Sequence, residues 1–174
     1  MKVKVQKLTD NAKLPSIKHD SDFCYDLVAT KRTHKGLFFW EYEVGLAMQI
    51  DRTDEVIEYG ESIRDFWGTA VGTTGYKGIS FRRSPIKLSL DIRPRSSIKD
   101  TGLVLCNSEG TIDEEYTGPI KFYFYHVLPW KKVYKVGDRI GQIKLGFTLP
   151  IDFEWVDKLN DTERGNGGFG STGK

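Results

Sequence analysis

Cysteine and histidine are scarce in this chain of 174 residues, which has two cysteines and three histidines. Cys24 and Cys106 show neither a CxxC spacing nor a Cys/His cluster, so we expect neither a disulfide framework nor a zinc site. Apolar runs of membrane-spanning length are lacking too, and residues 1–5 alternate lysine with valine instead of forming a signal-peptide core. We therefore expect a soluble protein of the reducing cytoplasm with no membrane partner.

The chain also lacks a strong charge of either sign. Lysine and arginine number 26 against 24 aspartates and glutamates, which leaves a net charge of only +2. A protein that binds nucleic acid through a general basic surface carries a larger excess, so we expect no nucleic-acid partner. Any anion site in this chain must be local.

Helical periodicity is nearly absent, whereas apolar residues with a period of two are common. Such alternation occurs around Val3, at 88–92, at 122–124 and at 140–145. Aromatic residues make up 13% of the chain and 18 glycines separate the short apolar runs, which favours an antiparallel β-barrel or jelly roll. The best helix candidate, about 100–104, is too short to matter unless Pro94-Arg95-Ser96 leads into a single turn. Residues 51–87 break the pattern and are interpreted as an inserted hairpin or long loop.

The last eleven residues, 164–174, are rich in glycine. They contain Gly165-x-Gly167-x-x-Gly170 and an almost complete P-loop pattern ending at Lys174, but no residues follow that would form the helix on which both motifs depend. Glycine amides, hydroxyls and a guanidinium still suit an anion. We expect a flexible C-terminal arm, 164–174, that closes over a phosphate ligand, next to a β domain of residues 1–163. The alternative is an untethered terminus.

Two further polar segments follow predicted strands. Residues 107–118 lie between the strand-like runs 103–105 and 120–122, which predicts a hairpin or a pair of short strands with polar groups at its mouth. Residues 93–97 place a rigid proline before a guanidinium and two hydroxyls, a combination that suits a phosphate. Taken alone, the first segment is equally compatible with a solvated edge and the second with a basic turn.

The order of these segments carries more information than any one of them. The runs Tyr25-Asp26-Leu27, Pro94-Arg95-Ser96-Ser97, 107–118, 137–142 and 164–173 resemble, in this order, the five motifs of the trimeric dUTP nucleotidohydrolase (dUTPase) family. The resemblance implies a distorted β jelly roll, a homotrimer with shared active sites, and a glycine-rich arm that covers a site of neighbouring subunits. It also implies hydrolysis of dUTP to dUMP and pyrophosphate, which limits uracil incorporation into DNA and supplies dUMP for dTMP synthesis.

The resemblance assigns roles to individual residues. Asp113 takes the place of the catalytic carboxylate that orients and deprotonates the attacking water, and Asp26 that of the acid that holds Mg²⁺ through a water. Tyr116 takes the place of the ring beneath the deoxyribose, which excludes a 2′-hydroxyl. The expected substrate-binding residues are Arg95, Ser96, Ser97, Asn107, Gly110, Thr111, Ile112, Tyr116, Gln142, Arg164, Phe169, Gly170, Ser171 and Thr172.

Three other interpretations remain open at this stage. The dCTP deaminases share several of these motifs but use a catalytic glutamate in a different third motif, where this chain has Asp113 and Tyr116. The alternation of aromatic and basic residues at 121–132 is also found in single-strand-binding β modules. A regulator that binds a protein partner through the insertion at 51–87 would keep the fold.

Overall fold

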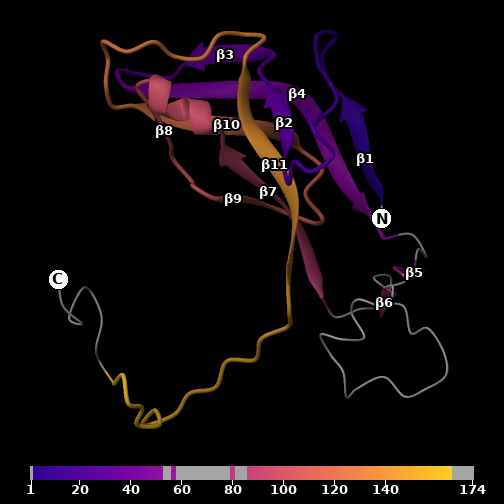
Figure 1. The fold of residues 1–174 in the computed structure, drawn as a ribbon, viewed down its shortest axis with the longest axis vertical. Coiled ribbons are helices and arrows are strands. Elements are labelled where there is room, and N and C mark those ends of the chain that lie inside the picture. Colours follow the sequence, from indigo (N-terminus) through magenta and orange to yellow (C-terminus); the bar gives the residue numbers. More distant parts are fainter. Residues whose placement is uncertain (1, 53–55, 58–78, 81–85, 166–174) are drawn as a thin grey trace.

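The computed structural model describes residues 2–52, 56–57, 79–80 and 86–165. Two antiparallel sheets pack against each other (Figure 1). One sheet has the order β1-β4-β10-β8 with β3 added on β4, and the other has the order β2-β11-β7-β9. The prediction of an all-β protein is therefore confirmed.

The strands of the first sheet are β1 (Lys2–Lys7), β3 (Lys31–His34), β4 (Phe39–Asp51), β8 (Leu103–Leu105) and β10 (Pro119–His126). Those of the second are β2 (Tyr25–Val28), β7 (Lys87–Pro94), β9 (Gly110–Asp113) and β11 (Arg139–Thr148). A short pair, β5 (Val56–Ile57) and β6 (Ile79–Ser80), is antiparallel, and a 3₁₀ helix, η1, spans Ser96–Asp100.

The core lies between the two sheets, where the alternating strands place their apolar side chains. Leu88, Leu90 and Ile92 of β7 are buried, and Ile120, Phe122 and Phe124 of β10 are buried on the facing sheet. Strand β4 shows much weaker alternation because its residues are buried along most of its length. This strand was therefore harder to recognise in the sequence than the half-buried strands.

The segment 103–122 is more complex than a hairpin. Strands β8 and β10 do pair antiparallel, but β9, which lies between them in sequence, pairs with β7 in the other sheet. The chain therefore crosses from one sheet to the other after β8 and returns before β10. The short helix candidate at 100–104 is not a helix, because residues 103–105 form β8; the single helical turn is η1, which begins at Ser96. Pro94, which cannot donate a backbone hydrogen bond, ends β7 directly before that turn.

The predicted excursion at 51–87 begins where β4 ends and stops where β7 begins. Strands β5 and β6 pair within it, and most of its other residues lie outside the described part of the chain.

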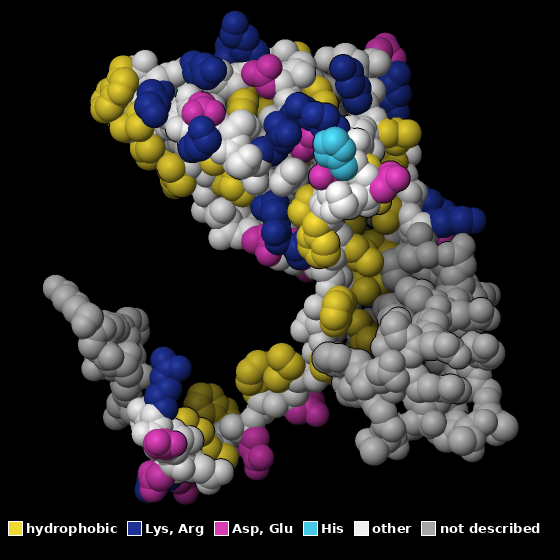
Figure 2. Space-filling model, in the orientation of Figure 1, with side chains coloured by type: hydrophobic (Ala, Val, Ile, Leu, Met, Phe, Trp, Pro, Cys, Tyr) yellow, Lys and Arg dark blue, Asp and Glu magenta, His cyan; other side chains and the backbone are white. Residues whose placement is uncertain are grey.

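After β11 the chain runs away from the sheets without regular structure as far as Gly165 (Figure 1). Hydrophobic side chains stand exposed along this segment (Figure 2). Phe153 is 92% exposed and Trp155 is fully exposed, so neither ring packs against the described part of its own chain. Among the described residues there is no helix long and apolar enough to span a membrane.

Candidate active site

Asp26 lies at the centre of a polar cluster. Its Oδ1 accepts hydrogen bonds from Arg95 Nε at 2.6 Å and Gln142 Nε2 at 3.3 Å, and its Oδ2 accepts one from Arg139 Nη1 at 3.0 Å. The residue is only 7% exposed, and a carboxylate at that depth is stable when cations and donors compensate its charge. The structure thus brings together Asp26, Arg95 and Gln142, which the sequence had placed in three separate motifs.

Arg139 is a member of this cluster that sequence reasoning missed. Strict strand alternation places residues 139 and 142 on opposite faces of a sheet. The pairing of β2 with β11 shifts register between Arg139 and Gly141, so one extra residue is accommodated there as a bulge. The bulge turns both side chains toward Asp26. The motif 137–142 contained the residue, but its alternation alone pointed away from the site.

Gly141 permits this bulge because no side chain fits at its position. A Cβ there would lie 2.2 Å from Phe122 Cε1 and 3.0 Å from the backbone oxygen of Arg93. Phe122 is fully buried, so the strand approaches the core as closely as the ring allows. A larger residue would push β11, and Gln142 with it, away from Asp26.

The loop after β7 carries the next predicted substrate contacts. Ser96 is exposed at the start of η1, while Ser97 Oγ lies 3.3 Å from the phenol oxygen of Tyr134. The backbone oxygen of Tyr134 in turn accepts a hydrogen bond from Tyr42 Oη at 2.9 Å and one from Arg32 Nη1 at 3.0 Å. A chain of hydrogen bonds thus supports the Arg95-Ser96-Ser97 loop from the core.

A second polar group surrounds strand β9. Asp113 is exposed at the end of this strand, opposite Ser89 of β7, whereas Ile112 beside it packs against the core. Gly110 is crowded: a Cβ there would lie 2.8 Å from Asn107 Nδ2 and 2.8 Å from Ile92 Cγ1. The strand therefore anchors on the core through Ile112 and presents Thr111 and Asp113 on its outer face.

Tyr116 follows in a tight turn, in which its backbone N–H donates to the Asp113 oxygen at 3.0 Å. Its ring is 46% exposed, and its hydroxyl donates to the Pro119 oxygen at 3.1 Å. A Cβ at Gly118 would lie 2.5 Å from that hydroxyl oxygen, so the glycine leaves room for the ring. Asp113 and Tyr116 are thus held in one short, defined segment.

The two polar groups share a face of one sheet but do not meet. Asp26 pairs with Gln142, Gln142 with Arg93, and Asp113 with Ser89, so all of them lie on the outer face of β2-β11-β7-β9. Strand spacing and residue rise put Asp26 and Asp113 about 20 Å apart on this face. One chain therefore holds the two halves of the predicted site at diagonal corners of a sheet.

Comparison with known proteins shows the family of this chain. Residues 75–173, more than half of the chain, match the model of the dUTPase family. The deoxyuridine 5′-triphosphate nucleotidohydrolase of Corynebacterium glutamicum is 33% identical over 169 residues, which cover 96% of this chain and 99% of that protein. This chain belongs to the dUTPase family. The predicted enzyme class, a dUTP diphosphatase that hydrolyses dUTP, is confirmed with it.

Solved dUTPase structures have the same fold. The dUTPase of Staphylococcus bacteriophage 80alpha with dUpNHpp superposes with a TM-score of 0.67 at 17% identity, over 99% of both chains. A point mutant of the dUTPase from phage phi11 of S. aureus, described with a structural Mg(II) ion, superposes with a TM-score of 0.61 at 13% identity, over 92% of this chain and 100% of that one. The jelly-roll prediction is confirmed by these likenesses.

Between the two halves of the predicted site lies a network of paired charges. Lys144 Nζ lies 2.6 Å from Asp91 Oδ2 and 3.5 Å from Glu109 Oε1, and Arg93 also bonds Glu109. Burial of Asp91 opposes its ionisation, but the bonds from Lys144 and Ser89 outweigh this and lower the pKa of its carboxyl. The bond to Asp91 likewise raises the pKa of Lys144. The middle of this face therefore contains charges of both signs that neutralise each other locally.

The remaining predicted residues of this dUTPase belong to the C-terminal arm. Arg164 lies exposed in the extended segment beyond β11. Phe169, Gly170, Ser171 and Thr172 lie outside the described residues, so their role stays a prediction.

Proposed function

We propose that this enzyme hydrolyses dUTP by in-line attack of a water held by Asp113 on the α-phosphate, releasing dUMP and pyrophosphate. Asp113 is an exposed carboxylate whose backbone is anchored by strand pairing and by the adjacent turn. A carboxylate is a weak base at neutral pH, so its main contribution is to place the water in line with the bond that breaks. Proton removal accompanies attack as charge develops on phosphate oxygens.

The Asp26 cluster is the observation that carries this proposal, because it orients the Arg95 guanidinium to bind the phosphates. Asp26 bonds the Nε of Arg95, and no described residue hydrogen-bonds the two Nη groups of that guanidinium. Those groups form the outer fork with which an arginine binds phosphate oxygens in bidentate geometry. Ser96 and Gln142 add a hydroxyl and an amide donor beside it.

We propose Mg²⁺ as the cofactor. Both oxygens of Asp26 already accept bonds from arginines, so a direct bond to a metal is disfavoured, and a contact through water fits. Among the described residues no cluster of three His, Cys, Asp or Glu side chains is placed to hold a metal. Mg²⁺ commonly keeps several waters and binds through substrate phosphates, which suits such a donor set. There it would neutralise charge on the triphosphate.

We propose that the deoxyuridine binds at the turn that follows β9. Tyr116 offers a half-exposed ring to the deoxyribose, and a ring packed there leaves no space for a 2′-hydroxyl. Asn107 precedes the same strand and residues 110–112 form most of it, and their polar groups would read the uracil edge. The hydroxyl of Tyr116 is held by Pro119, so the ring is pre-oriented.

We propose that the working form is a homotrimer with shared sites. Asp26 and Asp113 of one chain are about 20 Å apart, and each must come within hydrogen-bond reach of waters on the same triphosphate. A second copy that places its β9 turn beside the Asp26 cluster resolves this distance. The exposed Phe153 and Trp155 fit a segment that crosses another subunit and delivers the arm 164–174 to its site.

A second candidate function is regulation through a protein partner at the insertion, 51–87. The phage 80alpha relative is described in work stating that phage dUTPases control transfer of virulence genes by a G protein-like mechanism. Removal of the insertion separates the two functions, because hydrolysis should persist if the insertion serves a partner. We place both functions in the cytoplasm, in keeping with the free thiols of Cys24 and Cys106.

The test is pyrophosphate release with Mg²⁺ from dUTP, dCTP, dTTP and UTP in parallel, for the wild-type protein and Asp113→Asn. We expect release from dUTP alone, and at least about 10³-fold slower turnover in Asp113→Asn with the affinity for a non-hydrolysable dUTP analogue retained. Release of ammonia from dCTP, or wild-type turnover by Asp113→Asn, contradicts the proposal.

A further inference from the structure

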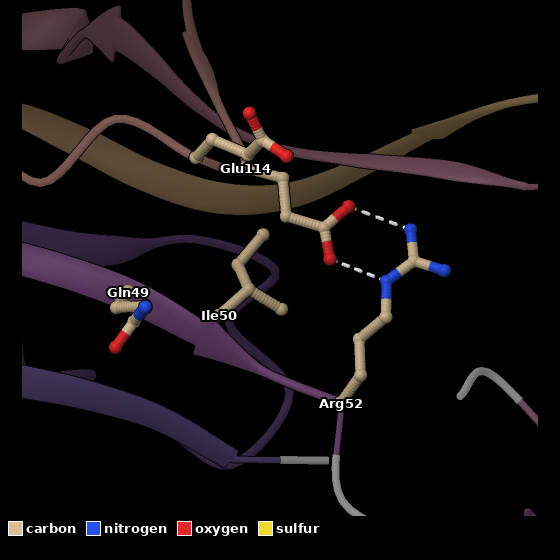
Figure 3. A pocket seen from close by; sticks show the side chains of 5 residues that line it. Gln49, Ile50, Arg52 and Glu114 are labelled. Atoms are coloured by element: carbon tan, nitrogen blue, oxygen red, sulfur yellow. Dashed lines mark hydrogen bonds and ion pairs between the residues drawn. The ribbon is translucent and has the colours of Figure 1, made fainter.

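Arg52 and Glu114, which are far apart in sequence, form an ion pair with two parallel hydrogen bonds. Arg52 follows the last residue of β4, and Glu114 follows Asp113, the last residue of β9. Arg52 Nε bonds Glu114 Oε1, and Arg52 Nη2 donates to Glu114 Oε2 at 2.6 Å (Figure 3). This fork-to-carboxylate geometry fixes the orientation of both groups, which a single contact does not do.

The pair also reaches the start of β7. Arg52 Nη2 donates to the Ile86 oxygen at 2.7 Å, and the Glu114 carboxylate accepts a hydrogen bond from the backbone of Leu88. Glu114 is thereby connected to two strand ends, of β4 and β7, which flank the insertion on either side. The side chains of Arg52 and Glu114 are only 21% and 24% exposed, so water competes weakly for these bonds.

Glu114 is the residue through which this contact reaches the site. Asp113 is exposed on the outer face of the sheet, and Glu114 beside it turns the other way, toward the ends of β4 and β7. The turn closes with the bond from Tyr116 N–H to the Asp113 oxygen. A carboxylate clamped at Glu114 therefore restricts the backbone that aims both Asp113 and the Tyr116 ring.

A pocket lies beside the ion pair, so the turn depends on the pair to hold its position. Among the described residues, an open pocket of about 510 Å³ is lined by Gln49, Ile50, Arg52, Glu114 and Glu115. Figure 3 shows the ion pair bridging from the end of β4 to the turn beside this space. Because the described residues do not pack closely there, they leave the turn room to move when the bonds are broken. A displacement of about 1 Å in a catalytic group costs on the order of 100-fold in rate.

We propose that Arg52 is a positioning residue for dUTP hydrolysis, which acts through Glu114 to hold Asp113 in line with the α-phosphate. The inference rests on the proposed role of Asp113 and adds a residue outside the five motifs. The bond to Arg52 lowers the pKa of Glu114, so the carboxylate stays charged and bonded at neutral pH.

The experiment compares Arg52→Ala, Arg52→Lys, Glu114→Gln and the double variant Arg52→Ala/Glu114→Gln with the wild type. Lys4→Ala is the matched control, because Lys4 forms an ion pair at 2.9 Å with Asp51, next to Arg52, and none with Glu114. We expect kcat to fall about 10- to 100-fold in Arg52→Ala with KM for dUTP changed less than about twofold. Arg52→Lys should recover only part of the loss, because lysine keeps the positive charge but cannot form two parallel bonds to the carboxylate.

Two outcomes overturn the proposal. One is an unchanged kcat in Arg52→Ala and Glu114→Gln. The other is a double variant in which kcat falls by the product of the two single-variant factors. Residues that act as one unit instead give a fall in kcat no larger than that of one single variant. A merely structural role would lower the unfolding midpoint without separating kcat from KM.

Hydrogen exchange separates this inference from the proposed function. In Arg52→Ala the backbone amides of 113–116 should exchange at least about fivefold faster, and those of β10 should not change. If the wild type fails to hydrolyse dUTP, the proposed function is wrong, and unchanged exchange at 113–116 independently shows that Arg52 does not hold the turn.

Discussion

Arg95 Nε lies 2.6 Å from Asp26 Oδ1, so the carboxylate expected to contact the metal is also the partner of the arginine expected to bind the phosphates. Arg139 bonds the other oxygen of the same carboxylate. The orientation of the guanidinium proposed to bind the phosphates is therefore set by Asp26, so the predicted metal role of this residue is coupled to the proposed role of Arg95.

Replacement of this carboxylate should affect binding and stability together. In Asp26→Asn two guanidinium groups lose their counter-charge, so we expect kcat/KM for dUTP to fall about 100-fold and the affinity for a dUTP analogue to weaken. The free energy of unfolding should fall by about 2 kcal/mol, less than for a fully buried pair because Arg139 is half exposed. Denaturant unfolding at fixed protein concentration and steady-state kinetics measure both. Asp100→Asn, which breaks the exposed pair with Lys99, should change neither.

Tyr116 should determine the choice between deoxyribose and ribose. In Tyr116→Ala the ring is removed, and we expect the ratio of kcat/KM for dUTP over UTP to fall about 100-fold. Tyr116→Phe keeps the ring and loses only the bond to Pro119, so it should retain the selectivity. Pyrophosphate release from both nucleotides measures the ratio, and an unchanged ratio in Tyr116→Ala contradicts the steric role.

Removal of the arm should separate folding from activity. A chain that ends at Glu163 keeps both sheets and their core, so we expect an unchanged circular dichroism spectrum and oligomeric state. Without Arg164 and the residues after it, water is no longer excluded, and kcat/KM should fall by at least about 100-fold. A chain that lacks only Lys174 is the control and should remain active. Full turnover by the chain ending at Glu163 would contradict the proposal that the arm 164–174 closes over the site.

Tyr42 should make stability sensitive to alkaline pH. Burial raises the pKa of this phenol to about 12, from about 10 in an unfolded chain. Between these values the unfolded state releases the proton while the folded state retains it, so the folded protein loses stability as the pH rises from about 10 to 12. Below about pH 10 this contribution is fully present. Urea unfolding between about pH 8 and about pH 11.5 measures the slope, which should be smaller in Tyr42→Phe; an equal slope in both proteins contradicts the assignment.

The same tyrosine connects the core to the site. Its hydroxyl holds the backbone of Tyr134, whose own hydroxyl lies next to Ser97. Tyr42→Phe at neutral pH should therefore loosen the loop 95–97 more than the β9 turn. Hydrogen exchange of the two segments distinguishes these effects.

The sequence by itself determined the all-β class, the alternating strands β1, β7, β10 and β11, and the five motifs, because alternation and turn residues are local properties. It also supplied the separate identities of Asp26, Arg95, Asp113, Tyr116 and Gln142. Strand β4 could not be recognised from the sequence, since its burial on both faces removes the alternation that marks a strand.

Only the tertiary structure decided which of these residues meet. The bulge before Gly141 brings Arg139 to Asp26 against the local alternation, and the passage of β9 into the second sheet places Asp113 about 20 Å from Asp26. The contact between Arg52 and Glu114 joins residues that no pattern relates. Such partners are chosen by the packing of two sheets on one core, a long-range property that a period of two residues does not encode.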